Sequence, residues 1–252
     1  MFNRKQTGEI RWKTPDADYY KISEAALEAE HTLIAGYTGC GKTTFLRSIL
    51  QVILVKDSPA RAKLILIDPK QTDLEKCAKL PHTLRYADDL DKTHDALKYA
   101  YEEMGRRQAE RRRQDAEVFQ GSAIYVIIDE LNPILTDKRN KERAVMSQFY
   151  IEQIVSLGRA ANIHLIACTQ NPNKTTIPAN ISDNCTCRFG LHCMTPIQSR
   201  QIILQGGCEY LPKHGETLAI IDGMLGHYVL PYVTPQDIKP LINYWMSSEC
   251  RA

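Results

Sequence analysis

The sequence lacks any long apolar run and any large excess of one charge. No apolar segment approaches the roughly 18 residues of a membrane-spanning helix, and the N-terminus Met1-Phe2-Asn3-Arg4-Lys5-Gln6 has no signal-peptide apolar region. The net charge of +2 does not indicate a nucleic-acid binder, so any such surface must be local. Repeats and low-complexity tracts are also missing. We therefore expect a cytoplasmic α/β protein without direct membrane insertion.

The eight cysteines lack the C-x-x-C spacing of zinc sites and the compact framework of small secreted proteins. Reduced thiols are the simpler interpretation. Cys185, Cys187 and Cys193 alternate with polar residues along one expected strand over 185–193. This pattern indicates buried cysteines on an apolar face and argues against a metal site.

A glycine-rich loop at residues 36–43 organises the chain, because the apolar run 32–35 precedes it and a helical pattern from Lys42 to Val55 follows. The spacing G-x-x-x-x-G-K-[ST] suits a nucleoside triphosphate, since glycines let backbone N–H groups surround phosphate oxygens at a helix N-terminus. Lys42 would reach the β- and γ-phosphates and Thr43 would bind Mg²⁺. The residues expected to hold the nucleotide are Gly36, Tyr37, Thr38, Gly39, Cys40, Gly41, Lys42, Thr43 and Thr44.

Further apolar, β-branched runs predict strands over 64–67, 124–128 and 163–168, and each ends in polar residues. Because ligands collect at the carboxyl ends of parallel strands, these endings predict one shared active edge. Helices are expected over 23–28, 91–117, 143–157 and 196–205, and further strands over 10–13 and 217–221.

Two acids and an amide follow the later strands. Asp129 ends a strand expected beside the loop and would hold Mg²⁺, and Glu130 would polarise the attacking water. Gln170 would hydrogen-bond the γ-phosphate or that water. A surface acid and a plain loop glutamine are the alternative interpretations of Glu130 and Gln170.

Arginines are candidates for neutralising charge in the transition state. Arg159, Arg188 and Arg200 are considered, with Arg159 first, although each could form a surface salt bridge instead. The basic stretch 106–113 is interpreted either as a solvated helix face or as a cationic patch facing DNA or another subunit.

An ordered set of motifs extends over residues 25–235. It includes Leu66-Ile67-Asp68-Pro69-Lys70, Ile127-Ile128-Asp129-Glu130-Leu131, Gly158-Arg159-Ala160-Ala161-x-Ile163-His164-Leu165 and Thr169-Gln170-x-Pro172. This series resembles the FtsK/SpoIIIE family of DNA translocase motors. The resemblance implies a RecA-like P-loop NTPase with a mostly parallel central sheet flanked by helices, in a homo-oligomeric, usually hexameric, ring around double-stranded DNA.

The same resemblance implies site roles. ATP and Mg²⁺ would bind between subunits, so Arg159 would complete a neighbour's site. The loop after the metal acid would grip the DNA backbone through Lys138, Arg139, Lys141 and Arg143.

The chain departs from the family pattern in several places. Asn171 stands where the family commonly has arginine, and the stretch after residue 235 is too short for a DNA-reading winged-helix module. We expect a lead-in at 1–25, a motor domain at 26–235 and a tail at 236–252. These features favour a transfer or coupling ATPase of a mobile element over chromosome segregation, recruited by membrane or relaxase proteins.

Two other functions stay open at this point. A motor of type VII protein secretion resembles the same motifs, and a non-catalytic factor could use ATP only for assembly. ABC-type cassettes are disfavoured because no Leu-Ser-Gly-Gly signature occurs.

Overall fold

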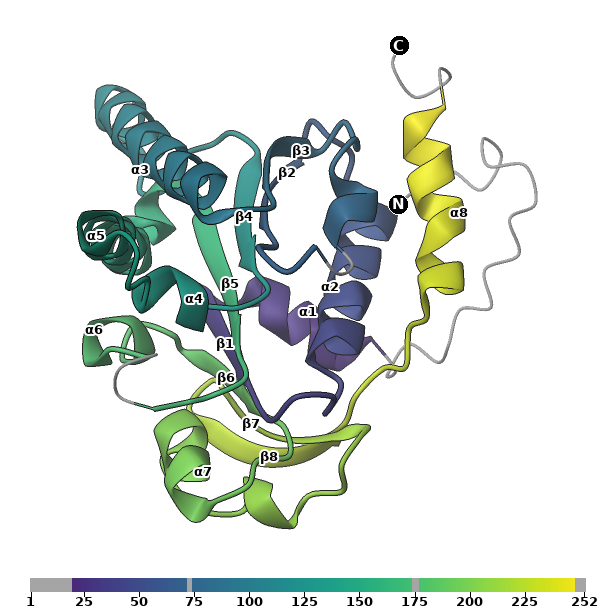
Figure 1. The fold of residues 1–252 in the computed structure, drawn as a ribbon. Helices are drawn as coiled ribbons and strands as arrows, with labels where there is room; N and C mark the ends of the chain where they lie inside the picture. The colour runs from purple at the N-terminus through teal and green to yellow at the C-terminus, as the bar shows by residue number, and fades with distance from the viewer. Residues whose placement is uncertain (1–19, 72–73, 174–176, 248–252) are drawn as a thin grey trace.

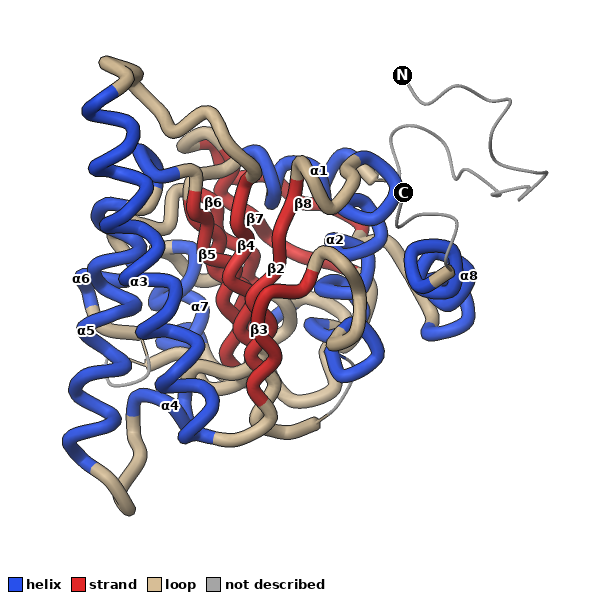
Figure 2. Tube along the Cα trace, turned by 90° about the horizontal axis from the view of Figure 1, so that it is seen from above, coloured by secondary structure: helices blue, strands red, loops and turns tan. Residues whose placement is uncertain are grey.

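An eight-stranded sheet in the order β3-β2-β4-β5-β1-β6-β7-β8 runs through the molecule (Figures 1 and 2). The structure is a computed structural model that describes residues 20–71, 74–173 and 177–247. The strand expected over 10–13 lies outside these residues. The strands are β1 (His31–Ala35), β2 (Ala62–Ile67), β3 (Thr83–Ala87), β4 (Ala123–Ile128), β5 (Ile163–Thr169), β6 (Cys187–Gly190), β7 (Glu216–Ile221) and β8 (Met224–Val229).

The strand directions confirm the expected mostly parallel sheet. All pairs from β3 to β6 are parallel, and the antiparallel β7 and β8 extend one edge. The central strands are buried along almost their whole length, which explains their continuous apolar runs.

The position of β5 corrects one expectation. The strand ending at Asp129 is not beside the loop strand, because β5 lies between β1 and β4. Ala35 pairs with Thr169 and Ile128 pairs with Ala167, so the three strands end at the same edge. The predicted shared edge is confirmed. Gln170, which follows β5, lies at this edge between the ends of β1 and β4.

Helices cover both faces of the sheet (Figure 2). One face carries α1 (Lys21–Glu28), α2 (Lys42–Lys56) and α8 (Pro235–Met246), and the other carries α3 (Leu90–Arg113), α4 (Asn132–Leu135), α5 (Lys141–Leu157) and α6 (Ala179–Ser182). Helix α7 (Pro196–Ile203) packs against β6 and β7. Short 3₁₀ turns are η1 (Leu74–Cys77), η2 (Arg159–Ala161) and η3 (Cys208–Tyr210).

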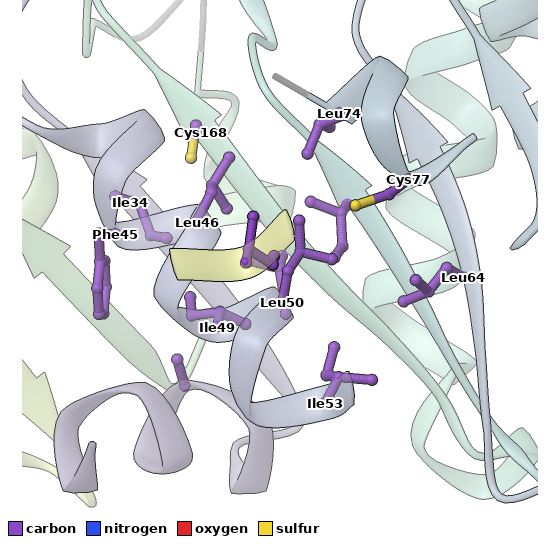
Figure 3. Close-up of a cluster of buried hydrophobic side chains, with 14 of the residues drawn as sticks. Ile34, Phe45, Leu46, Ile49, Leu50, Ile53, Leu64, Leu74, Cys77 and Cys168 are labelled. Atoms are coloured by element: carbon purple, nitrogen blue, oxygen red, sulfur yellow. The ribbon is translucent and has the colours of Figure 1, made fainter. Parts of the chain in front are cut away.

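Helix α2 is anchored by one apolar stripe (Figure 3). Phe45, Leu46, Ile49 and Ile53 recur at helical spacing and are at most 1% exposed. Burying each such side chain contributes about 1.5–3 kcal/mol. This stripe therefore fixes the helix whose N-terminus carries the glycine loop.

Helix α8 lies where the sequence predicts a tail, over residues 236–252, and no helix. Ile238, Leu241 and Trp245 are buried in the same core as α2, and the Trp245 indole N–H donates to the Leu54 carbonyl oxygen at 2.9 Å. The described part of this segment thus packs as an element of the fold.

One arginine of the basic stretch of α3 is used inside the protein. The Arg107 side chain is 4% exposed and donates to the carbonyl oxygens of Ser122 and Ala161 at 2.8 and 3.1 Å. Arg106 pairs with Glu103 and Glu110. The Arg106 side chain is 56% exposed, so its ion pairs lie at the surface, and Arg112 and Arg113 are exposed at the end of α3.

The expected strand over 185–193 is shorter than predicted, because β6 spans only Cys187–Gly190. Cys185 lies in a turn after α6 and packs on the α5 side of the sheet, whereas Cys187 packs on the α2 side and Cys193 near α7. Every described cysteine is buried. Within the described ranges, no cluster of His, Cys, Asp or Glu could hold a metal ion by itself.

Candidate functional site: a nucleotide pocket at the carboxyl edge of the sheet

The glycine loop adopts a backbone that its glycines make accessible. Gly39 and Gly41 have φ angles of 77° and 107°, in the region that L side chains rarely occupy. A Cβ at Gly36 would lie 2.7 Å from the Cys40 Sγ and 2.8 Å from the Leu191 Cβ. The loop is therefore packed directly on the segment after β6, and α2 begins at its end.

Lys42 folds back over the loop. Its Nζ donates to the carbonyl oxygens of Gly36 at 2.7 Å and Tyr37 at 3.0 Å, and the residue is 6% exposed. Cys40 is buried beneath the loop, where desolvation raises the pKa of its thiol. The loop thus carries its positive charge on Lys42, and Cys40 acts as a packing residue.

Asp129 has the environment of a metal ligand. The carboxylate is 6% exposed, and burial, followed by the nearby Asp68, raises its pKa to about 6. Within the part of the chain that the structure describes, this carboxylate forms no hydrogen bond or ion pair with another residue, so a cation would stabilise its charged form. A carboxylate and the Thr43 hydroxyl are hard oxygen ligands, which fits Mg²⁺ held jointly with phosphate oxygens.

Glu130 is held by three neighbours. Its side chain is 3% exposed and forms an ion pair with Lys70, with 3.1 Å between Nζ and Oε2. The Gln170 backbone N–H lies 3.2 Å from both carboxylate oxygens, and the Asn132 N–H donates at 3.4 Å. Lys70 follows β2, so the motif Asp68-Pro69-Lys70 supplies the cation for this acid, a partner that the sequence did not identify.

Gln170 connects the two halves of the site. The Thr38 hydroxyl donates to the Gln170 Oε1 at 2.8 Å, while the Gln170 backbone contacts Glu130. This double contact follows from the place of β5 between β1 and β4. A change in the loop can therefore reach Glu130 through a single residue.

A second wall faces the glycine loop across a cavity of about 520 Å³. It comes from the start of β7 and the segment after β8, which are remote from the loop in sequence. The cavity is lined by Gly39, Gly41, Lys42, Thr43, Thr44, Gln170, His214, Gly215, Leu230, Pro231 and Tyr232. Sequence reasoning missed the last five, because no local motif marks them.

Arg159 lies far from this cavity within its own chain. It precedes β5, whereas Gln170 follows that seven-residue strand, so roughly 20 Å separates them at about 3.3 Å per residue. The Arg159 side chain is 73% exposed and pairs with Glu30 at 2.8 Å. The rest of its motif is structural: a Cβ at Gly158 would lie 2.5 Å from the carbonyl oxygens of both Ile154 and Ile163.

The other two arginine candidates differ from each other. Arg188 is buried and donates to the carbonyl oxygens of Ser182 and Cys185, so it holds the turn after α6. Arg200 is exposed on α7.

The basic loop before α5 divides into two parts. Lys138, Arg139 and Lys141 are exposed. Arg143 is instead bound to Asp137 and Asp91, and the Asp137 carboxylate also accepts the Arg139 backbone N–H. The Arg143 hydrogen bond holds the pKa of Asp137 below its ordinary value. Arg143 therefore fixes the loop, and the other three cations face solvent.

The described residues include no helix that is long and apolar enough to cross a membrane.

Comparison with known proteins places this geometry in a family. The FtsK/SpoIIIE family model matches residues 17–121. DNA translocase FtsK of Helicobacter pylori is 30% identical over 230 residues, covering 85% of this chain and 27% of the relative. FtsK of Staphylococcus aureus is 28% identical over 242 residues, covering 86% and 30%. The chain thus spans less than a third of the length of these curated relatives.

Solved structures show the same fold. The pCW3 conjugation coupling protein TcpA, in a monomer form with ATPγS, superimposes with a TM-score of 0.73 at 21% identity, covering 86% of this chain and 66% of that one. The type VII secretion ATPase EccC of Thermomonospora curvata gives a TM-score of 0.68 at 21% identity, covering 81% and 25%. With its sheet, its glycine loop and these matches, the chain has the RecA-like P-loop ATPase fold and belongs to the FtsK/SpoIIIE family.

Proposed function

We propose that this chain is an ATP-hydrolysing motor that moves double-stranded DNA as a homo-oligomeric ring. The observation that carries the hydrolytic part is Gln170, which contacts the P-loop Thr38 through its side chain and Glu130 through its backbone. Such a link lets the contents of the P-loop influence the acid that would activate water.

Each residue has a role in this mechanism. Lys42 and the loop N–H groups bind the phosphates, and Lys42 exchanges its carbonyl partners for phosphate oxygens. Thr43 and Asp129 would hold Mg²⁺, which neutralises charge on the phosphates. Glu130 orients the water and accepts its proton, and Gln170 holds the γ-phosphate side of the site.

DNA as the cargo is supported by the relatives that are DNA translocases and by TcpA, a conjugation coupling protein. Transfer of a mobile element, with membrane or relaxase partners, is the role we favour. Phosphate contacts from Lys138, Arg139 and Lys141 would grip DNA without reading its sequence.

The primary test measures ATP turnover against protein concentration, with and without duplex DNA. We expect turnover that rises with concentration and with DNA, and a Glu130→Gln variant that binds ATP but loses at least about 100-fold in kcat. Absence of turnover in the assembled wild type would favour a non-catalytic assembly factor. Stimulation by a peptide and not by DNA would favour a protein-secretion motor, as EccC has been solved with a signal sequence peptide.

The role proposed for Arg159 is to complete a neighbour's site. Its exposed ion pair with Glu30 is weak, so the guanidinium is available to another subunit. Arg159→Ala and Lys42→Ala rings should each be inactive, whereas mixed rings should regain turnover, because some interfaces combine an intact P-loop with an intact Arg159. If mixing restores nothing, Arg159 does not act between subunits.

A further inference from the structure

The wall opposite the P-loop is held firmly in place. The Leu230 N–H donates to the Gly215 carbonyl oxygen at 2.8 Å, and an Arg47 guanidinium N–H donates to the Val233 carbonyl oxygen. Leu230 and Val233 are 6% and 2% exposed. Since Arg47 belongs to α2, the segment between β8 and α8 is tied to the same helix that follows the P-loop.

The chemistry of this wall is apolar and aromatic. Leu230, Pro231 and Tyr232 line the cavity, and Tyr232 is 75% exposed although both flanking residues are buried. An exposed tyrosine ring on a fixed segment offers a face on which a planar base can stack.

Hydrogen-bonding groups that could identify the base are scarce along the same wall. The Leu230 N–H is already donated to Gly215, and Pro231 has no N–H. Among the described residues the lining includes no Asp or Glu, so none of them offers a carboxylate to accept the N1 and N2 protons of guanine. Gln170 is engaged at the phosphate end by Thr38. Among the described residues of the lining, the remaining polar side chains besides those of the P-loop residues Lys42 and Thr43 are His214, Thr44 and the hydroxyl of Tyr232 itself.

We propose that Pro231 and Tyr232 form a nucleobase-stacking subsite that accepts a purine without distinguishing adenine from guanine. The inference rests on the proposed function, because the P-loop must bind the triphosphate that directs the base towards this wall. The base contributes affinity through stacking, and the phosphates contribute it through Lys42 and the loop.

The test compares the dissociation constants of ATP, GTP and inorganic tripolyphosphate, each with Mg²⁺, by titration calorimetry on the full chain. ATP and GTP should bind the wild type within about fivefold of each other. Tyr232→Ala should weaken both by about tenfold and leave tripolyphosphate unchanged. Tyr232→Phe should retain both affinities, because the ring is kept. Tyr210→Ala, at an exposed aromatic residue of η3 outside the lining, is the matched control and should change nothing.

Several results would overturn the subsite. Unchanged ATP affinity in Tyr232→Ala would exclude stacking, and an equal loss for tripolyphosphate would show that the substitution disturbs the P-loop instead. A preference for ATP over GTP above about 50-fold would show that the wall reads the base. If the wild type binds neither tripolyphosphate nor ATP, the proposed function itself is overturned, and the subsite with it.

Discussion

Lys70 and Glu130 form an ion pair at the carboxyl ends of the neighbouring strands β2 and β4, with 3.1 Å between Nζ and Oε2. The Glu130 side chain is 3% exposed, whereas that of Lys70 is 38% exposed. The acid is therefore fixed in the protein and the lysine approaches it from the surface. The pair thus restricts the orientation of the Glu130 carboxylate.

Removing the lysine should destabilise the fold through the carboxylate that remains. We expect Lys70→Met to lower the free energy of unfolding by about 1–2 kcal/mol, since a buried charge loses its partner while the pair is partly screened by water. In a Glu130→Gln background, Lys70→Met should lower the free energy of unfolding by much less. Urea denaturation of the two single variants and the double variant gives the coupling energy.

Lys98→Met is the control for this cycle, because Lys98 and its partner Glu102 are both more than half exposed. Lys98→Met should change the free energy of unfolding by close to zero. Equal destabilisation by Lys70→Met in both backgrounds would show that the ion pair does not stabilise the protein.

Gln170 should affect turnover more than binding. Gln170→Ala removes the side-chain acceptor of Thr38 and keeps the backbone N–H that contacts Glu130. We expect kcat to fall by about 10- to 100-fold, as for other positioned polar groups, while the dissociation constant of ATP changes only a few-fold. Thr38→Val, which breaks the same contact from the loop, should lower kcat in the same direction. A rise in the dissociation constant with unchanged kcat would make Gln170 a binding residue only.

The sequence predicted the elements that carry strong local signals. Continuous apolar runs gave β2, β4 and β5, and the P-loop spacing gave α2 to within a residue at its end. By contrast, β3 and β8 are edge-region strands whose residues are mostly part-buried or exposed, so no apolar pattern marks them. Helix α8 carries Pro240 in its interior, which argues against a helix when only local preferences are considered, whereas Pro235 stands at the first position, where proline is well tolerated.

The parts of the site that sequence missed depend on contacts between distant segments. Lys70 meets Glu130 because β2 pairs with β4, and Tyr232 meets the P-loop because the chain returns past α2 after β8. Neither contact leaves a spacing in the sequence. Arg143 is similar, since its partner Asp91 is 52 residues away. Residue chemistry at strand ends was therefore predictable, and pairing across the sheet was not.

Two glycines should respond to alanine in opposite directions. At Gly158 the new Cβ would lie 2.5 Å from two backbone carbonyl oxygens, which cannot move without shifting α5 or β5. We expect Gly158→Ala to lower the free energy of unfolding by about 2–3 kcal/mol. Gly105 lies inside α3 with nothing near its Cβ position, so Gly105→Ala should raise stability by about 0.5–1 kcal/mol. Urea midpoints measure both, and a neutral Gly158→Ala would contradict the tight packing at this helix end.

Acid should destabilise the protein through His31. The imidazole is 1% exposed, its Nδ1 accepts the Leu165 backbone N–H at 3.0 Å, and burial lowers its pKa from 6.5 to about 3. The His31 side chain therefore takes up a proton below pH 6.5 in the unfolded chain but only near pH 3 in the folded chain. Between these two values, the free energy of unfolding decreases as the pH falls. At pH 5.5 the loss from this group should be about 1 kcal/mol relative to pH 7.

Urea denaturation at the two pH values measures this effect. His31→Asn should be less stable than the wild type at pH 7. Between pH 7 and pH 5.5, however, its free energy of unfolding should fall by about 1 kcal/mol less than that of the wild type. His214→Asn, at an exposed position, should leave the difference between the two pH values unchanged. An unaltered pH dependence in His31→Asn would mean that other groups, such as His82 or His164, whose pKa values burial also lowers, account for the acid sensitivity.

The basic loop before α5 provides a test that separates DNA binding from folding. Lys138, Arg139 and Lys141 are exposed, so replacing all three with alanine should leave the unfolding midpoint unchanged. If each neutralises one phosphate, the slope of log K against log salt for duplex DNA should become shallower by about 0.9 per residue, and DNA stimulation of ATP turnover should fall with it.

Arg143→Ala should behave in the opposite way. Its guanidinium is 16% exposed and holds Asp137, whose side chain is 4% exposed, so the substitution leaves a buried carboxylate without its cation. We expect a lower unfolding midpoint and a nearly unchanged salt slope for the fraction that remains folded. A triple variant that binds DNA with the wild-type slope would place the DNA contacts elsewhere on the protein, because exposed cations that touch phosphates cannot be removed without changing counterion release.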